Sequence, residues 1–121
     1  MTRQTTGWTV RLTESAEHDF SNIIRWSAER FGKAHARAYA EAISMALQEL
    51  TTTGPAVTGV ATRDNIVPGL LSLHVARKRR KGRHFIMFRV TEHDTRVIDV
   101  LRILHDAMDL PRHVPPAADA E

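Results

Sequence analysis

The sequence contains no cysteine among its 121 residues. Disulfide bonds and thiolate metal sites are therefore excluded, and a reducing compartment is the location that this composition favours. No apolar run approaches the ~18 residues that a membrane-spanning helix needs, and no signal-like apolar segment follows Met1. We therefore expect a cytoplasmic protein with no membrane partner.

Several common catalytic patterns are also missing. The sequence has no GxSxG, no phosphate-binding P-loop and no HExxH. None of its seven histidines lies four residues from another, which is the spacing that places two metal ligands on one helix face. We predict no metal site and no cofactor, and we favour a protein that acts by binding over an enzyme.

Acidic residues are absent from one long segment, although the whole chain has 17 Lys and Arg against 14 Asp and Glu. Between Asp64 and Glu92 the charge is +7, so the remainder of the chain, whose total is +3, carries −4. Such a split indicates a polyanionic or acidic partner for one face, with a solvated turn as the alternative. The basic residues are Arg77, Lys78, Arg79, Arg80, Lys81, Arg83 and Arg89.

The spacing of apolar residues predicts an α+β fold. We expect an N-terminal strand, an antiparallel helical hairpin and then a mostly antiparallel sheet of about four strands, with the helices packed on one face. Thr13 is the expected N-cap of the first helix, and Gly32 ends it in a left-handed conformation. The expected strands are 8–12, 71–75, 83–90 and 95–104, the helices are 14–31 and 33–52, and residues 54–69 form a loop.

The last two strands are apolar on both faces, which predicts that they lie in the middle of the sheet. The first expected strand should join the sheet beside a later one. By strict alternation, one face of the strand at 83–90 carries Ile86, Phe88 and Val90, and the other carries Phe85, Met87 and Arg89. In the last strand, one face carries Val97, Leu101 and Ile103, and the other carries Ile98, Val100 and Leu104.

One domain is predicted over residues 8–114. Residues 1–7 are polar and aperiodic, which predicts a flexible N-terminal tail. Residues 115–121 begin with two prolines and contain no large apolar side chain, so we expect a disordered C-terminal tail.

Three charged residues near the two central strands form a candidate site. Arg89, Arg102 and His105 are expected to converge on the sheet surface, where they would suit phosphate binding, with His105 as a general acid or base. The alternative is a set of salt bridges, in which Arg102 or Arg89 pairs with Asp106 or Asp109. For catalysis the salt bridges are favoured, and for binding the cluster is favoured.

The chain from about Trp8 to Val114 resembles the ParE toxins of the RelE/ParE superfamily of bacterial toxin–antitoxin modules. The Arg-x-Leu-His string with its following Met-Asp is the most specific part of the resemblance. The segments that carry it are Val10–Glu17, Ala38-Tyr39, Pro68-Gly69-Leu70, Phe85–Val90 and Arg102–Asp109.

This resemblance implies a toxin that inhibits DNA gyrase by binding and is neutralised by a cognate antitoxin in a hetero-oligomer. Direct binding of free nucleic acid is expected to be weak or absent. The alternative is a ribosome-dependent mRNA endoribonuclease of the RelE branch, using Arg89, Arg102 and His105. A third possibility is a nucleic-acid-binding module without toxicity, which the basic segment alone would suit.

The resemblance and the basic segment together suggest which residues meet each partner. Contact with the target is expected from Arg77, Lys78, Arg79, Arg80, Lys81, Arg83, Leu104, His105, Met108 and Asp109.

The antitoxin is expected to lay an amphipathic helix, with or without an added strand, over the helical hairpin and sheet. The residues expected to contact it are Phe20, Ile24, Tyr39, Ile43, Arg89 and Arg102.

Overall fold

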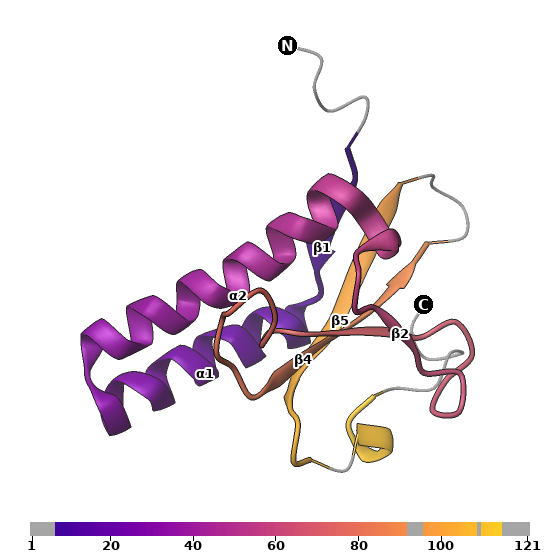
Figure 1. Cartoon of the computed structure of the whole chain (residues 1–121). Helices are drawn as coiled ribbons and strands as arrows, with labels where there is room; N and C mark the ends of the chain where they lie inside the picture. Colours follow the sequence, from indigo (N-terminus) through magenta and orange to yellow (C-terminus); the bar gives the residue numbers. More distant parts are fainter. Residues whose placement is uncertain (1–6, 92–95, 109, 115–121) are drawn as a thin grey trace.

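The computed structural model describes residues 7–91, 96–108 and 110–114, so the two predicted tails lie outside the described residues, apart from Gly7. A helical hairpin and a sheet make up its two layers (Figure 1). In chain order the elements are β1 (Thr9–Leu12), α1 (Glu14–Phe31), α2 (Lys33–Thr53), the 3-10 helix η2 (Gly54–Ala56), β2 (Ala61–Thr62), β3 (Leu71–His74), β4 (His84–Val90), β5 (Val97–His105) and the 3-10 helix η3 (Leu110–Arg112).

The sheet has the strand order β1-β5-β4-β3-β2, with both helices packed on one of its faces (Figure 1). β1 runs parallel to β5, and the other neighbours are antiparallel. The predicted α+β architecture is therefore confirmed, as are the central position of the last two strands and the pairing of the first strand with a later one. The loop expected at 54–69 contains the two-residue β2, which makes five strands among the described residues where about four were expected.

The start of α1 and the joint between the helices follow from local chemistry. Thr13 is the N-cap, and its hydroxyl accepts a hydrogen bond from the Ala16 N–H at 3.1 Å. The same Thr13 hydroxyl donates a hydrogen bond to the Leu101 carbonyl at 3.0 Å, which connects the start of the helix to β5. Gly32 joins the helices at φ 95° and ψ 165°. The expected left-handed helical conformation is wrong, because this ψ is extended; a positive φ of this kind still favours glycine.

Two apolar clusters lie on opposite faces of the sheet. The face under the helices holds Ile43 and Leu50 of α2 against Phe88 of β4, all fully buried. On the other face Met87 packs within a smaller cluster, to which Val114 contributes from the end of the described chain. Each fully buried side chain of this size stabilises the fold by about 1.5–3 kcal/mol. Both faces of the central strands are thus covered, as their composition predicted.

A β-bulge in β5 changes which residues face the helices. Met87 pairs with Arg102 while the next residue, Phe88, pairs with Val100, so Leu101 is the extra residue. Beyond it the alternation is inverted. Ile103 consequently joins Val100 in the helix-side core, and Leu104 joins Leu101 on the other face. The predicted faces of Ile103 and Leu104 are therefore wrong, because strict alternation does not survive an inserted residue.

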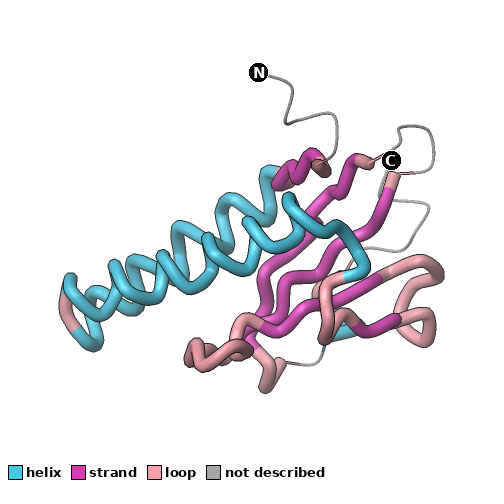
Figure 2. The backbone as a smooth tube through the Cα atoms, turned by 45° about the horizontal axis from the view of Figure 1, so that its top comes forward, coloured by secondary structure: helices cyan, strands magenta, loops and turns pink. Residues whose placement is uncertain are grey.

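The tip of the helical hairpin extends beyond the strands (Figure 2). Trp26 and Phe31 near this tip have exposed fractions of 53% and 56%, and Met45, farther along α2, has one of 52%. Helical spacing predicts an apolar stripe on the first helix that ends at Phe31, but the sheet does not reach that residue. The stripe consists of Ala16, Phe20, Ile23, Ile24, Ala28 and Phe31. In the described part of the chain, neither helix has the length and apolarity needed to cross a membrane.

Candidate functional site

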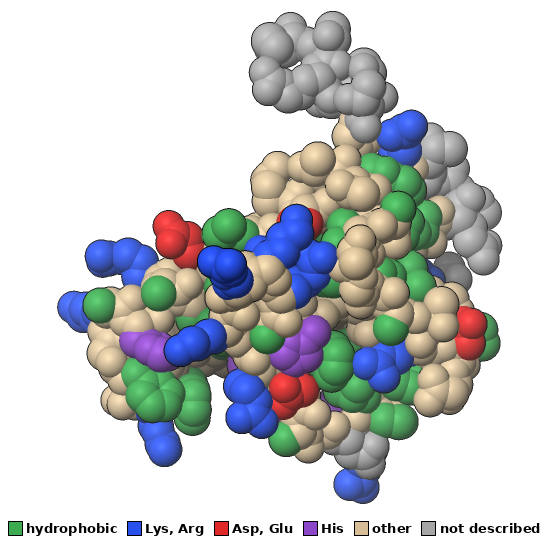
Figure 3. Space-filling view, in the orientation of Figure 1, with side chains coloured by type: hydrophobic (Ala, Val, Ile, Leu, Met, Phe, Trp, Pro, Cys, Tyr) green, Lys and Arg blue, Asp and Glu red, His purple; other side chains and the backbone are tan. Residues whose placement is uncertain are grey.

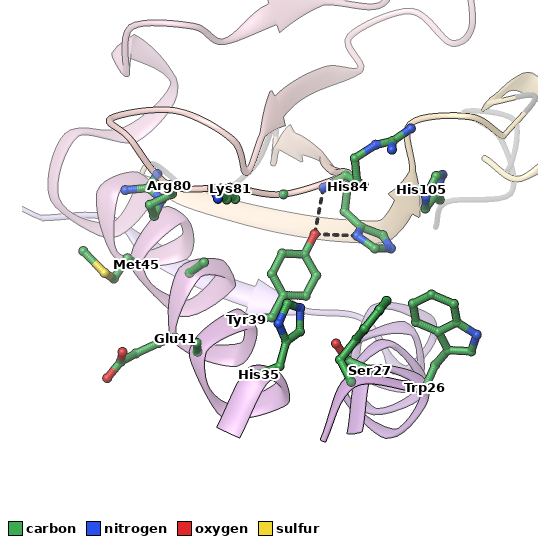
Figure 4. Close-up of a pocket in the computed structure, with 15 residues that line it drawn as sticks. Trp26, Ser27, His35, Tyr39, Glu41, Met45, Arg80, Lys81, His84 and His105 are labelled. Atoms are coloured by element: carbon green, nitrogen blue, oxygen red, sulfur yellow. Dashed lines mark hydrogen bonds between the residues drawn. The ribbon is translucent and has the colours of Figure 1, made fainter. Parts of the chain in front are cut away.

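A groove of about 640 Å³ lies between the hairpin tip and the end of the sheet where β4 begins and β5 ends. We call it the groove. Trp26 and Ser27 of α1 and His35 and Tyr39 of α2 stand on one side, facing His84 (Figure 4). The remaining residues that line it are Phe31, Ala38, Glu41, Ala42, Met45, Arg80, Lys81, Gly82, Arg83 and His105.

Tyr39 and His84 fix the floor of the groove. Their hydroxyl and Nδ1 atoms share a hydrogen bond of 2.6 Å, and the Arg83 N–H donates to the same hydroxyl at 3.0 Å (Figure 4). Burial, reinforced by the nearby His105, lowers the pKa of His84 to about 4, while burial raises the pKa of Tyr39. Both side chains are therefore neutral at pH 7, so the floor provides oriented polar groups without a net charge.

The wall formed by the hairpin tip is aromatic. Trp26 and Phe31 meet edge to face with ring centroids 5.8 Å apart, and Phe31 lies 4.8 Å from the His35 ring. The Arg30 guanidinium sits 5.2 Å from the Trp26 ring. These contacts hold large apolar rings at the surface, and exposed rings of this kind mark interaction sites.

The second surface is the basic turn, residues 77–81 in the loop between β3 and β4. The Arg80 N–H donates to the Arg77 carbonyl at 2.9 Å. The two central residues, Lys78 and Arg79, have φ of 52° and 70°. These features are the signature of a type I′ turn, which strongly prefers Asn-Gly at its centre. Lys and Arg there each cost about 1 kcal/mol in backbone strain.

Glu49 of α2 anchors this turn. Its carboxylate pairs with Arg77, with Arg80 at 3.0 Å and with Lys78 at 2.9 Å. Arg77 also donates to the Thr58 carbonyl. Burial of the carboxyl opposes its ionisation, but hydrogen bonds from the three cations outweigh that effect and lower the pKa of Glu49 to about 2. One acidic residue thus holds three basic ones.

The anchoring divides the basic residues into two groups. Arg77 and Arg80 are only 15% and 10% exposed, whereas the Lys78 side chain is 64% exposed. Arg79 and Lys81 are exposed, and within the described ranges neither forms an ion pair. Lys and Arg side chains are gathered where this loop crosses α2 (Figure 3). The turn therefore displays only part of its charge.

Asp106 lies beside the groove and binds Arg83, one of its lining residues. It accepts hydrogen bonds from His74 at 3.0 Å and from Arg83 at 3.2 Å. The hydrogen bond from His74, together with the charge of Arg83, lowers its pKa. Arg83 remains 68% exposed, so its guanidinium is accessible beside the groove.

Arg89, Arg102 and His105 do not converge, so the expected reaction cluster is wrong. Arg102 makes a two-pronged pair with Asp19 of α1 at 2.7 and 2.9 Å. Arg89 lies opposite Asp99 in the sheet, whereas His105 lies opposite His84. His84 and Arg89 are five residues apart along β4. At ~3.3 Å per residue that separation is about 16 Å. The salt-bridge alternative describes Arg102 correctly, but its partner among the described residues is Asp19 and not Asp106.

The residues predicted to contact the target differ in their exposure. Leu104 is 1% exposed and belongs to the core, so it cannot contact a partner. Met108 is 44% exposed, and His105 lines the groove. Asp109 lies outside the described residues.

The predicted antitoxin residues are also dispersed. Ile43 is fully buried, which contradicts a contact role, and Phe20 packs half-buried against the same core. Ile24 is half-buried on α1. Among the six, Tyr39 alone lines the groove, since Arg89 and Arg102 lie elsewhere on the sheet.

Sequence reasoning missed Trp26, Met45, His84 and Glu49. Trp26 lies outside the apolar stripe of the first helix, and Met45 lies outside the stripe of the second, which consists of Ala36, Tyr39, Ala40, Ile43, Leu47 and Leu50. A large apolar residue away from the stripe is the signal that identifies such positions. Glu49 and its cationic partners are 28 to 31 residues apart, so no local pattern links them. Within the described ranges, no group of three or more His, Asp or Glu side chains is arranged to hold a metal ion.

A helical hairpin over a five-stranded sheet, with an apolar groove beside a basic turn, defines a small α+β domain with two distinct surfaces. Residues 10–110 match the family described as ParE toxin of type II toxin–antitoxin system, parDE. The protein belongs to this family.

Two solved structures are similar in fold. One is a chromosomal ParDE toxin–antitoxin system from P. aeruginosa, with a TM-score of 0.62 and 22% identity, covering 81% of this chain and 95% of that one. The other is the toxin–antitoxin complex RelBE2 from Mycobacterium tuberculosis, with a TM-score of 0.51 and 19% identity, covering 82% of this chain and 98% of that one. No curated protein matches this chain significantly.

Proposed function

We propose that this toxin inhibits DNA gyrase by binding to it in the cytoplasm, and that a cognate antitoxin neutralises it. Membership of the ParE toxin family is the observation that carries this proposal. The separation of Arg89 and His105 supports binding over catalysis, because general acid–base chemistry needs its groups within hydrogen-bond reach of one substrate.

The surface that meets gyrase together with its bound DNA is assigned to the side chains that are accessible around the basic turn and the end of the sheet. Lys78, Arg79, Lys81 and Met108 are exposed there. A toxin of this type stabilises one state of its target, so it requires only a better fit to that state than to the others.

The antitoxin is assigned to the groove, as an acidic amphipathic helix. Trp26, Phe31 and Met45 provide the large apolar anchors that dominate binding energy in protein interfaces. Arg83 on the rim complements acidic residues on the polar side of such a helix. Rings held apart from the core can be covered by a partner without any rearrangement of the toxin.

The test uses purified toxin with purified gyrase and relaxed plasmid. We expect loss of supercoiling or accumulation of cleaved DNA as the toxin is added in stoichiometric amounts, and recovery when antitoxin is added. Unchanged supercoiling at a large excess of folded toxin would refute gyrase inhibition.

A second candidate is ribosome-dependent mRNA cleavage. The observation that favours it is the pair formed by His84 and His105, whose rings meet edge to face 5.2 Å apart at the groove floor beside Tyr39. A translation reaction tests it in parallel. Codon-specific cleavage that disappears in His105→Ala, with gyrase unaffected, would establish this activity in place of the first.

A further inference from the structure

The basic turn is strained in a way that the fold does not require. Its central residues Lys78 and Arg79 both adopt positive φ, where Asn-Gly would form the same type I′ turn without strain. Glu49 holds the turn by binding the flanking Arg77 and Arg80, which are nearly buried. Strained residues of this kind concentrate at functional sites.

The chemistry of the turn selects one class of partner. Residues 76–83 contain Ala76 as their only apolar side chain, so the turn has none of the large anchors that a protein interface uses. Its accessible groups are cations, notably Arg79 and Lys81, which are exposed and form no ion pair within the described chain. The sugar–phosphate backbone of nucleic acid is recognised through such charges and needs no apolar anchor.

We propose that the basic turn contacts the phosphates of duplex DNA, through Lys78, Arg79 and Lys81. This DNA is the DNA of the gyrase complex, and in that respect alone the phosphate contact rests on the proposed function. The contact itself is a property of the toxin and is measured without gyrase. With so few phosphates neutralised, affinity for free duplex is weak, on the order of 10⁻⁴–10⁻⁶ M, which agrees with the expectation of weak binding to free nucleic acid.

The test compares wild-type toxin with K78N/R79G. This variant removes two charges and installs the turn's preferred residues, so its Tm is expected to rise by about 3–6 °C through relief of strain. The probe is a fluorescent mixed-sequence duplex of about 20 base pairs, with affinity followed by anisotropy over a range of KCl concentrations. The slope of log K against log[KCl] is expected to fall in magnitude by roughly 1.8, since each phosphate contact contributes ~0.9.

Two further variants keep the result interpretable. K33Q/R37Q removes the same charge from exposed positions of α2 and is expected to leave the slope within error of wild type. Arg79→Gln changes one charge in the turn and is expected to lower the slope by about half as much as the double variant.

Three results would overturn the proposal: an unchanged slope in K78N/R79G, an equal fall in K33Q/R37Q, or a loss of binding to DNA-free gyrase with the DNA slope intact. The last would identify an acidic protein surface as the partner. Supercoiling is measured on the same samples. If wild-type toxin leaves gyrase active while the slope falls as expected, the proposed function fails and the phosphate contact stands.

Discussion

The groove and the basic turn are neighbours that differ in kind. The groove displays rings such as Trp26 and Phe31 around a neutral floor, whereas the turn is anchored by Glu49 and displays cations such as Arg79. Exposed apolar area provides most of the affinity of a protein interface, while exposed charge governs association rate and salt dependence. The difference supports the proposal that one domain of this size presents separate surfaces to two chemically different partners.

The largest expected effect is on antitoxin binding by the groove. Trp26→Ala with Phe31→Ala should weaken antitoxin affinity by about 2–4 kcal/mol, roughly 30- to 1000-fold, because both anchors are lost. Isothermal titration calorimetry measures the change. Met108→Ala is the matched control, since Met108 is an exposed apolar residue outside the groove. Equal losses in the control and the double variant would show that the groove is not the docking site.

Removal of the charge on Glu49 tests how the turn is held. Glu49→Gln leaves three cations around a neutral amide, and the free energy of unfolding should fall by about 2–3 kcal/mol. Urea denaturation measures it. Glu41→Gln, exposed on the same helix, should change stability by less than about 0.5 kcal/mol. A Glu49→Gln protein as stable as wild type would mean that the anchor contributes nothing.

Acid should affect the two surfaces in succession. His84 has a pKa of 6.5 when unfolded and about 4 in the fold, so the unfolded chain binds the proton first and stability declines as pH falls from 6.5 toward 4. The pKa of Glu49 is about 2 in the fold and 4.5 in the unfolded chain. Its contribution to the free energy of unfolding is therefore complete above pH 4.5 and is lost as the pH falls toward 2. Denaturant titrations from neutral to acid pH follow both losses.

Each of these two losses of stability should disappear when the residue that causes it is replaced. His84→Gln should flatten the upper part of the decline and Glu49→Gln the lower part. A decline of the same shape in both variants would assign acid sensitivity to other groups.

The smallest effect concerns the association rate of the antitoxin. K78N/R79G should slow association with an acidic antitoxin by less than about threefold at low salt and leave dissociation unchanged, because an exposed charge steers encounter without anchoring the complex. Stopped-flow measurements separate the two rates. A large increase in the dissociation rate would place the turn inside the antitoxin interface.

Periodicity predicts most of the fold because apolar spacing is a local property. The strand at Thr9–Leu12, the helical hairpin and the central strands all follow from it. The inserted residue Leu101 could not be predicted, because a bulge depends on register with β4 and leaves no mark in the β5 pattern. Ile103 and Leu104 were assigned to the wrong faces for that reason.

The candidate site was harder to predict than the fold. The basic segment is visible in the sequence, but its division into anchored Arg77 and accessible Arg79 depends on Glu49, a contact between distant segments. Trp26 was overlooked because a surface ring breaks the stripe that identifies a helix. Arg102 was assigned to a reaction cluster, whereas a partner on α1, Asp19, holds it.

Antitoxin affinity and the salt dependence of DNA binding, measured on the same two variants, test the separation of the surfaces most directly. We expect W26A/F31A to lose antitoxin affinity and to keep the wild-type slope of log K against log[KCl] for DNA binding. We expect K78N/R79G to keep antitoxin affinity within about threefold and to show a smaller slope. If both variants lose both properties to the same extent, the groove and the turn form one interface and the account is wrong.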